Sequence, residues 1–384
     1  MVVPSTLRGR CRRAAALALL LLILLAGCAR PWSIEVSWKG GSLGAITDER
    51  WREWAETFAA EVVDEHALPL ERALWEMGIT AIETLSVDDA AAIDWAEVAD
   101  DAWLRDDGRI VLNGEERTAA TVTVTSPPEE ALVTAHVTDV APTICRALGI
   151  GAPATATGTA LDAPSTERAV FIFIDGLGYR RYAAARERSL MPYLDSLGQP
   201  HLALGVYPSV TRVTSAAFLT GAMPAVNGVR SRNVRATDAE TLLDVLVANG
   251  LTSVSVEGDS LAFNMRNTDV VLSGDRDGNG HTDDNTFANA MDVIATRMPD
   301  FLWVHFHGID DLGHTYGPDA VEVDRKMTEV DGYVREMVNA LPEGTLVIIG
   351  ADHGMHAVSE DGRQGNHGTL QPADILVPLW VTVR

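Results

Sequence analysis

The sequence is poor in cysteine and in basic residues, and each shortage excludes a class of protein. Of its three cysteines, Cys11 and Cys28 lie in the first 28 residues, so Cys145 is alone in the rest of the chain. A scaffold held together by disulfides is therefore excluded, and Cys145 is expected to be a small buried side chain. Lys and Arg number 30 against 54 Asp and Glu, a formal net charge of −24. No nucleic-acid polymer is expected as a partner, because phosphate backbones require neutralising cations.

The first residues have the composition of an export signal. Residues 8–13 contain four arginines, and the apolar run 14–25 that follows is short for a membrane span. It ends in Leu-Ala-Gly-Cys28, which resembles the bacterial lipoprotein signal. The resemblance implies a signal peptide over 1–27 and an exported protein anchored to the cell envelope by lipid on Cys28. An ordinary signal peptide and an uncleaved anchor helix are the alternatives.

The rest of the chain divides into two parts with different patterns. Residues 28–126 mix short strand and helix patterns, including a helix that Thr47 would cap, and predict a small α+β module of unknown role. Residues 127–384 alternate helices with near-continuous apolar runs, at 169–174, 251–256, 301–306 and 345–349. Such runs indicate an α/β fold with a mostly parallel sheet covered on both faces. Ligands bind beyond the carboxyl ends of the strands in these sheets.

Side chains suited to metal binding and catalysis follow these runs in order. They are Asp175, Thr211, Asp310, His314, Asp352, His353 and His367. Mixed Asp and His sets suit zinc and similar ions, and a set this large would fill two sites. The hydroxyl of Thr211 stands at a predicted strand-to-helix turn, where the helix dipole favours attack on an anionic phosphorus centre. Taken alone, Thr211 would be interpreted as a helix N-cap rather than as a nucleophile.

The ordered motifs resemble a known family. Phe-Ile-Asp-Gly, Pro-Ser-Val-Thr, Asp-x-x-Gly-His, Asp-His-Gly-Met and Gly-x-His-Gly look like the type I phosphodiesterase/nucleotide pyrophosphatase branch of the alkaline phosphatase superfamily, over about residues 168–380. The resemblance implies a three-layer fold and hydrolysis of small phosphate esters by a threonine nucleophile with two divalent metal ions, for which zinc is the candidate. One ion would be held by Asp310, His314 and His367, and the other by Asp175, Thr211, Asp352 and His353.

The chain also departs from the family pattern. Thr214 stands where nucleotide-acting members often carry Asn, and Asn227 stands where relatives often carry His. These two residues and Arg212 are candidates for substrate binding. Residues 138–150 resemble a helix and a Leu-Gly-Ile ending that normally follow the last histidine loop. We therefore expect a circular permutation in which 127–164 is a C-terminal element moved forward.

A separate loop is a candidate calcium site. Asp275, Asp277 and Asn279 alternate before Gly280, and Asp283 follows. This spacing resembles a calcium loop of alternating oxygen ligands, although a threonine stands where a bidentate Glu is expected. A solvated loop beside a helix that begins near Asp283 is the alternative.

Several functions remain open at this stage. A phosphodiesterase or nucleotide pyrophosphatase is the leading interpretation, with a phosphomonoesterase or a phosphonate hydrolase of the same fold as alternatives. A sulfatase is excluded because the chain lacks the Cys/Ser-x-Pro-x-Arg setting of its nucleophile. A non-catalytic lipoprotein that binds a surface partner is the remaining alternative, and metal content separates it from the enzymes.

Overall fold

A computed structural model describes residues 31–384 apart from residues 60, 62–65 and 361. The predicted signal peptide over 1–27 and the lipidation site Cys28 lie outside the described residues. Within the described part of the chain, no helix combines the length and apolar character that crossing a bilayer requires.

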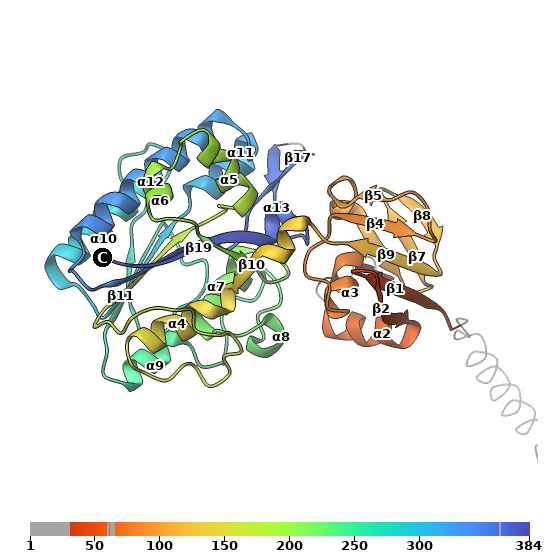
Figure 1. The fold of residues 1–384 in the computed structure, drawn as a ribbon, viewed down its shortest axis with the longest axis horizontal. Helices are drawn as coiled ribbons and strands as arrows, with labels where there is room; N and C mark the ends of the chain where they lie inside the picture. The colour runs from red at the N-terminus through yellow and green to blue at the C-terminus, as the bar shows by residue number, and fades with distance from the viewer. Residues whose placement is uncertain (1–30, 60, 62–65, 361) are drawn as a thin grey trace, which may run out of the picture.

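The larger part of the chain is built on one eight-stranded sheet (Figure 1). In spatial order its strands are β10 (Val133–His136), β12 (His201–Leu204), β19 (Leu376–Val383), β16 (Leu346–Gly350), β11 (Ala169–Ile174), β15 (Phe301–Phe306), β13 (Ser253–Glu257) and β14 (Asp269–Leu272). All pairings are parallel except the two made by β19. The predicted fold class, α/β with a mostly parallel central sheet, is confirmed.

The strands in the middle of this sheet form where the sequence is apolar without interruption. Every residue of β11 and of β15 is buried, as expected when helices cover both faces. Their bounds coincide with the predicted runs, whereas β13 and β16 are shifted by one or two residues from the predicted 251–256 and 345–349.

Helices cover both faces of the sheet and complete three layers (Figure 1). One layer contains α4 (Val140–Ala147), α7 (Thr211–Thr220), α8 (Pro224–Asn227) and α9 (Leu242–Ala248). The opposite layer contains α5 (Tyr179–Glu187), α6 (Pro192–Ser196), α10 (Asp283–Arg297), α11 (Gly308–Tyr316) and α12 (Val321–Ala340). The helix α4 packs against α7 and β16. A hairpin of β17 (His356–Glu360) and β18 (Arg363–Asn366), followed by α13 (Pro372–Ile375), precedes β19.

Residues 31–126 form a second body, which we call the N-terminal module (Figure 1). One of its sheets contains β2 (Gly41–Thr47), β1 (Ser33–Trp38), β9 (Thr121–Thr125), β4 (Thr84–Val87) and β5 (Ile93–Asp94). The other contains β3 (Ala67–Pro69), β6 (Ala102–Arg105), β7 (Arg109–Leu112) and β8 (Glu115–Thr118). The helices are α2 (Asp48–Thr57) and α3 (Leu70–Glu76). The predicted cap of α2 is confirmed, because the Thr47 hydroxyl accepts a hydrogen bond from Arg50 N.

The N-terminal module is docked on the rest of the chain through a continuous apolar cluster. Its buried residues pack with Tyr207 and Leu370, among others from the central-sheet part. Leu370 also exchanges main-chain contacts with the module: its N–H donates to Glu71 Oε2 at 2.9 Å, and its carbonyl accepts from Ile82 N at 3.0 Å. The module is therefore hydrogen-bonded directly to the segment that follows His367.

Candidate metal centre

Two strands of the central sheet deliver two carboxylates and an imidazole to one point. The parallel register places the ends of β11, β15 and β16 level with one another. Asp175 follows β11 directly, and Asp352 and His353 follow β16. His353 Nε2 lies 3.1 Å from Asp352 Oδ2 and 3.5 Å from Asp175 Oδ1. The structure thus brings together three of the residues that the sequence predicted for one metal ion.

A second set lies beside the first. Asp310 is in the first turn of α11, and His314 is one turn later on the same face. Asp310 Oδ2 lies 3.2 Å from His314 Nε2, and Asp310 Oδ1 lies 3.6 Å from His367 Nε2. The rings of His353 and His367 stack with centroids 3.6 Å apart, so the two sets adjoin.

Main-chain carbonyls fix how the two stacked histidines face the centre. His353 Nδ1–H donates to Gly354 O at 2.9 Å, and His367 Nδ1–H donates to Ser209 O at 2.9 Å. Each ring therefore turns its Nε2 toward the carboxylates. Metal-binding histidines are oriented in this way by their other ring nitrogen.

Three buried carboxylate oxygens at the centre have no hydrogen-bond donor among the described residues. They are Asp175 Oδ1, Asp310 Oδ1 and Asp352 Oδ2. An unpaired anionic oxygen away from water is costly, and a cation offsets that cost. The donor set of carboxylates and imidazoles therefore fits divalent metal ions such as zinc.

His353 contributes to two groups of converging ligand atoms, each within 4.8 Å. One group is Asp175, Asp352 and His353, and the other is Asp310, His353 and His367. The sequence assigned His353 to the first set alone, whereas the structure places it between the two. His314 lies outside both groups. Its ring faces Arg363, whose Nη2 is 2.9 Å from both ring nitrogens.

The predicted nucleophile is at the edge of this centre. Thr211 is the first residue of α7, and its Oγ1 lies 3.3 Å from His353 Nε2. The amides of the first helical turn and the helix dipole favour an anion at this end. The hydroxyl, the carboxylates and the amide donors can therefore act on the same phosphate group.

The titration of these groups reflects their burial and their mutual charges. Burial raises the pKa of Asp175, but hydrogen bonds and positive charge from neighbouring histidines hold it well below its usual range. Burial and the charge of Asp175 raise the pKa of Asp352. Burial lowers the pKa of His353, but Asp352 and Asp175 raise it to about 10. Burial, with the charge of His353, lowers the pKa of His367 to about 3, which keeps it in the neutral form that binds metals.

A buried network behind Asp175 was missed by the sequence analysis. His305 donates through Nε2 to Asp175 Oδ2 at 3.0 Å and through Nδ1 to Glu257 Oε2 at 2.9 Å. Glu257 also accepts a hydrogen bond from Trp303 Nε1 at 2.8 Å. His305 stacks on Phe173 with centroids 3.7 Å apart. The signal was present, since Glu257 ends an otherwise uncharged strand that leads to the same edge of the sheet.

The centre opens into a cleft of about 650 Å³ whose walls include Thr211, Arg212 and four more of the predicted ligands, namely Asp175, Asp310, His314 and His367. Arg212 lines this cleft, and its role in substrate binding stays a prediction. Thr214 is buried on α7 and donates its hydroxyl hydrogen to Asp352 O at 3.2 Å. Asn227 is also buried, and its amide bonds to Ala222 O and Val229 N within its own turn. Neither Thr214 nor Asn227 lines the cleft, so the structure gives no support to the prediction that they bind substrate.

The four predicted calcium ligands do not converge in the structure. The Asp275 carboxylate accepts hydrogen bonds from the main-chain N–H groups of residues 278, 279 and 280. Asp277 and Asn279 bond to each other through their side chains. Asp283 is buried and accepts from the N–H groups of His307 and Gly308. Among the described residues, the carboxylates of this loop form no group of three converging ligand atoms, so a calcium site is not supported.

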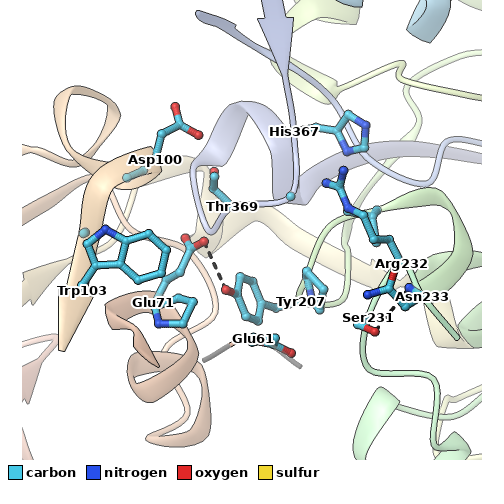
Figure 2. Close-up of a pocket in the computed structure, with 16 residues that line it drawn as sticks. Glu61, Glu71, Asp100, Trp103, Tyr207, Ser231, Arg232, Asn233, His367 and Thr369 are labelled. Carbon is cyan, nitrogen blue, oxygen red and sulfur yellow. Dashed lines mark hydrogen bonds between the residues drawn. The ribbon is translucent and has the colours of Figure 1, made fainter. Parts of the chain in front are cut away.

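A second pocket, of about 420 Å³, separates the N-terminal module from the central-sheet part beside His367. Figure 2 shows Trp103 and Glu71 of the module on one side and Arg232 and His367 on the other. Burial raises the pKa of Glu71 to about 8, although hydrogen bonds from Leu370 N and the Tyr207 hydroxyl oppose this effect. The module therefore forms a wall next to one of the predicted metal ligands.

Residues 252–378 match the family described as Type I phosphodiesterase / nucleotide pyrophosphatase. The family resemblance inferred from the motifs is confirmed over this range, which contains Asp310, His314, Asp352, His353 and His367.

The similar curated proteins are named as transferases. GPI ethanolamine phosphate transferase 3 of Schizosaccharomyces pombe is 26% identical over 246 residues, which cover 56% of this chain and 25% of the relative. The human GPI ethanolamine phosphate transferase 2 catalytic subunit is 25% identical over 59% of this chain and 24% of its own length. A shorter match of 85 residues, 39% identical, joins 22% of this chain to 8% of GPI ethanolamine phosphate transferase 3 of Eremothecium gossypii. This chain thus spans a quarter or less of these relatives.

Among solved structures, phosphonoacetate hydrolase from Sinorhizobium meliloti 1021 has a TM-score of 0.43 and 18% identity, over 55% of this chain and 62% of that one. Murine ectonucleotide pyrophosphatase / phosphodiesterase 5 has a TM-score of 0.41 and 13% identity, over 51% of this chain and 59% of that one.

Proposed function

We propose that this chain is a metal-dependent phosphoesterase that acts through Thr211 with two divalent metal ions, for which zinc is our candidate. The observation that carries the proposal is that three buried carboxylate oxygens, which lack a hydrogen-bond donor among the described residues, converge on the Nε2 atoms of His353 and His367. The Thr211 hydroxyl lies beside them at the N-terminus of α7. The match of residues 252–378 to the phosphodiesterase family supports the same reaction class.

The residues of the chain define the steps that we propose. Bound divalent ions would lower the pKa of the Thr211 hydroxyl and neutralise charge that develops on the phosphate oxygens. Thr211 Oγ1 loses its proton to water and bonds to phosphorus, while the bond from phosphorus to the leaving oxygen breaks and that oxygen takes a proton from water. A water molecule then loses a proton and bonds to phosphorus, while the bond from phosphorus to Thr211 Oγ1 breaks and Oγ1 takes up a proton. The first-turn amides of α7 stabilise the phosphate throughout.

A second candidate is transfer of the phosphoryl group to an alcohol acceptor. The names of the curated relatives, which are ethanolamine phosphate transferases, favour it. The first half of the reaction is then unchanged, and an alcohol replaces water in the second half. Phosphomonoester and phosphonate hydrolysis also fit the same centre. The substrate is a small phosphate ester in every case except the last, where it is a small phosphonate.

The first experiment measures hydrolysis of bis-p-nitrophenyl phosphate by the purified protein with zinc and after chelation with EDTA. Thr211→Ala should abolish cleavage and Thr211→Ser should retain part of it. The control Thr328→Ala removes an exposed hydroxyl that only bonds Asp324 O and should change nothing. Cleavage that survives in Thr211→Ala would exclude the nucleophile. A preference for p-nitrophenyl phosphate or for a phosphonate ester would select those alternatives, and p-nitrophenol release that rises with added ethanolamine would favour transfer.

The non-catalytic alternative, a surface-binding lipoprotein, predicts that the protein purifies without stoichiometric metal. Metal analysis of the purified protein separates it from the enzyme. Two equivalents of bound metal with no turnover of any phosphorus ester would refute the hydrolase and retain the metal centre.

We also propose that residues 1–27 are a lipoprotein signal, that lipid on Cys28 anchors the exported protein to the envelope, and that 127–164 is a permuted element. The packing of α4 against β16, the neighbour of β19, supports the last of these. Labelling with a fatty acid that is lost in Cys28→Ser tests the anchor. A chain that carries 127–164 behind residue 384 through a flexible linker tests the permutation, since it should still fold and bind metal.

A further inference from the structure

Four arginines line the metal cleft without an ion pair among the described residues, and one of them, Arg363, is directed to the ring of His314. The other three that line it are Arg212, Arg232 and Arg235. Within the described part of the chain none of them forms an ion pair, although acidic residues outnumber basic ones by 54 to 30. Asp259 lines the same cleft and is not paired with them. Their positive charge is therefore left free to act on a ligand.

Arg212 is held by the main chain. Its Nε donates to Ala262 O at 3.1 Å, and its Nη1 donates to the carbonyl of Arg232. Carbonyl oxygens satisfy N–H groups but do not neutralise the guanidinium charge. These bonds also tie the first turn of α7 to the loop that carries Arg232 and Arg235, so the three charges are placed relative to Thr211.

Arg232 lies where the cleft meets the second pocket, since it lines both. Its Nη2 is 3.9 Å from the position that a Cβ on Gly368 would occupy, directly after the predicted ligand His367. Figure 2 shows its guanidinium group directed toward His367. The charge of Arg232 therefore faces the metal centre from the side of the N-terminal module.

The three cations also oppose one another. Burial lowers the pKa of Arg212, and the charges of Arg235 and Arg232 lower it further. Like charges so placed raise the free energy of the protein until an anion binds between them. The planar, forked guanidinium group matches the geometry of phosphate oxygens.

We propose that Arg212, Arg232 and Arg235 bind a second phosphate group of the substrate, distinct from the phosphate that Thr211 attacks. This inference rests on the proposed phosphoesterase function and narrows it to esters that carry two phosphate groups. The subsite is separate from the metal ligands, because its donors are guanidinium groups on the loop after α8 and at the start of α7.

A matched pair of chromogenic substrates tests the subsite. Thymidine 5′-(p-nitrophenyl phosphate) carries one phosphate, and its 3′-phosphorylated form carries a second with the same leaving group. Arg232→Met and Arg235→Met should each lower kcat/KM for the bisphosphate substrate about tenfold or more, the usual range for a lost charge-assisted contact. The value for the one-phosphate substrate should change less than about threefold.

Arg230→Met is the control, because Arg230 is two residues from Arg232 but does not line the cleft: it donates to Ala225 O and lies over the Phe58 ring, 5.6 Å from its centroid, a packing contact that methionine can keep. It should leave both substrates unaffected. An equal loss on both substrates, or no loss on either, in the Arg232 and Arg235 variants would overturn the proposal.

Binding without turnover separates this subsite from the proposed reaction. In a Thr211→Ala background, calorimetry should show that thymidine 3′,5′-bisphosphate binds at least tenfold more tightly than thymidine 5′-phosphate. Adding Arg232→Met should remove that difference.

Binding to vesicles that contain a phosphorylated inositol lipid is measured in parallel. Arginine-dependent binding to these vesicles identifies a lipid as the source of the second phosphate, and binding of the soluble bisphosphate alone identifies a nucleotide as its source. Arginine-dependent binding without hydrolysis of any ester would refute the proposed function and support the subsite. Absence of arginine-dependent binding in both arms would refute the subsite.

Discussion

Asparagine in place of Asp352 should make the metal-depleted protein more stable and at the same time weaken its response to zinc. Asp352 is fully buried, its Oδ2 has no donor among the described residues, and Asp175 faces the same histidine. Without a cation, Asp352→Asn removes one of two buried like charges. We expect a gain of about 1–3 kcal/mol, the range for an unsatisfied buried polar group. Because the pKa of Asp352 is raised, this gain should be absent below the pKa of the unfolded carboxyl, grow as pH rises above it, and be complete above the raised pKa.

The wild-type protein should respond to zinc in the opposite sense. A site held at one hundred times its dissociation constant adds about 2.7 kcal/mol of stability. For a domain of this size, each kcal/mol moves the melting temperature by about 2–4 °C, so one filled site gives roughly 5–10 °C. Asp352→Asn should lose most of this shift, because its amide is a weaker ligand that carries no charge. Differential scanning fluorimetry with EDTA and with zinc measures both effects.

Asp331→Asn provides the matched control. Asp331 is also buried, but its two oxygens accept from Tyr193 N and Leu194 N at 2.9 Å each. Its replacement should lower stability equally with and without zinc. The reasoning would be refuted if zinc left the wild-type melting temperature unchanged, or if Asp352→Asn destabilised the metal-depleted protein and kept the full zinc shift.

Three further predictions concern the surroundings of the centre. Glu257→Gln should lower kcat and zinc affinity about 10–100-fold by loosening His305, without a comparable effect on KM, as kinetics and metal titration would show. Burial lowers the pKa of His356, but its two aspartate partners raise this pKa to about 10. The ion pairs of His356 should therefore contribute fully to the free energy of unfolding below about pH 6.5, and that contribution should disappear toward pH 10. Urea unfolding of His356→Gln should show no such fall in stability between these pH values. Burial raises the pKa of Glu71 to about 8, so the fold should lose stability as pH rises from about 4.5, and the loss should be complete above about pH 8. Glu71→Gln cannot ionise and should unfold at higher urea than the wild type at about pH 9, whereas a lower midpoint would contradict this account.

The sequence predicted the metal-binding residues because a parallel sheet collects its strand ends at one edge. Once the apolar runs are recognised as strands, Asp175 and Asp352 must lie near each other whatever the helices between them do. Periodicity carries no such information about the direction of a side chain on a buried helix. Thr214 shows this, because it lies one turn after Thr211 but points to the main chain of Asp352. The calcium loop was predicted from the spacing of oxygen-bearing residues alone. That spacing does not show that the Asp283 carboxylate accepts hydrogen bonds from His307 N and Gly308 N at the start of α11.

The role of residues 31–126 follows from contacts that no local pattern contains. His356 is held between Asp100 of the N-terminal module and Asp374, at 3.1 and 2.9 Å. Asp374 in turn accepts from Thr369 N at 3.1 Å, two residues after His367. Glu71 accepts from Leu370 N one residue further on. The loop that carries the predicted ligand His367 therefore bonds to Glu71 of the module on one side and to Asp374 of α13 on the other. A change in the docking of the module would displace His367, so the module belongs to the architecture of the centre.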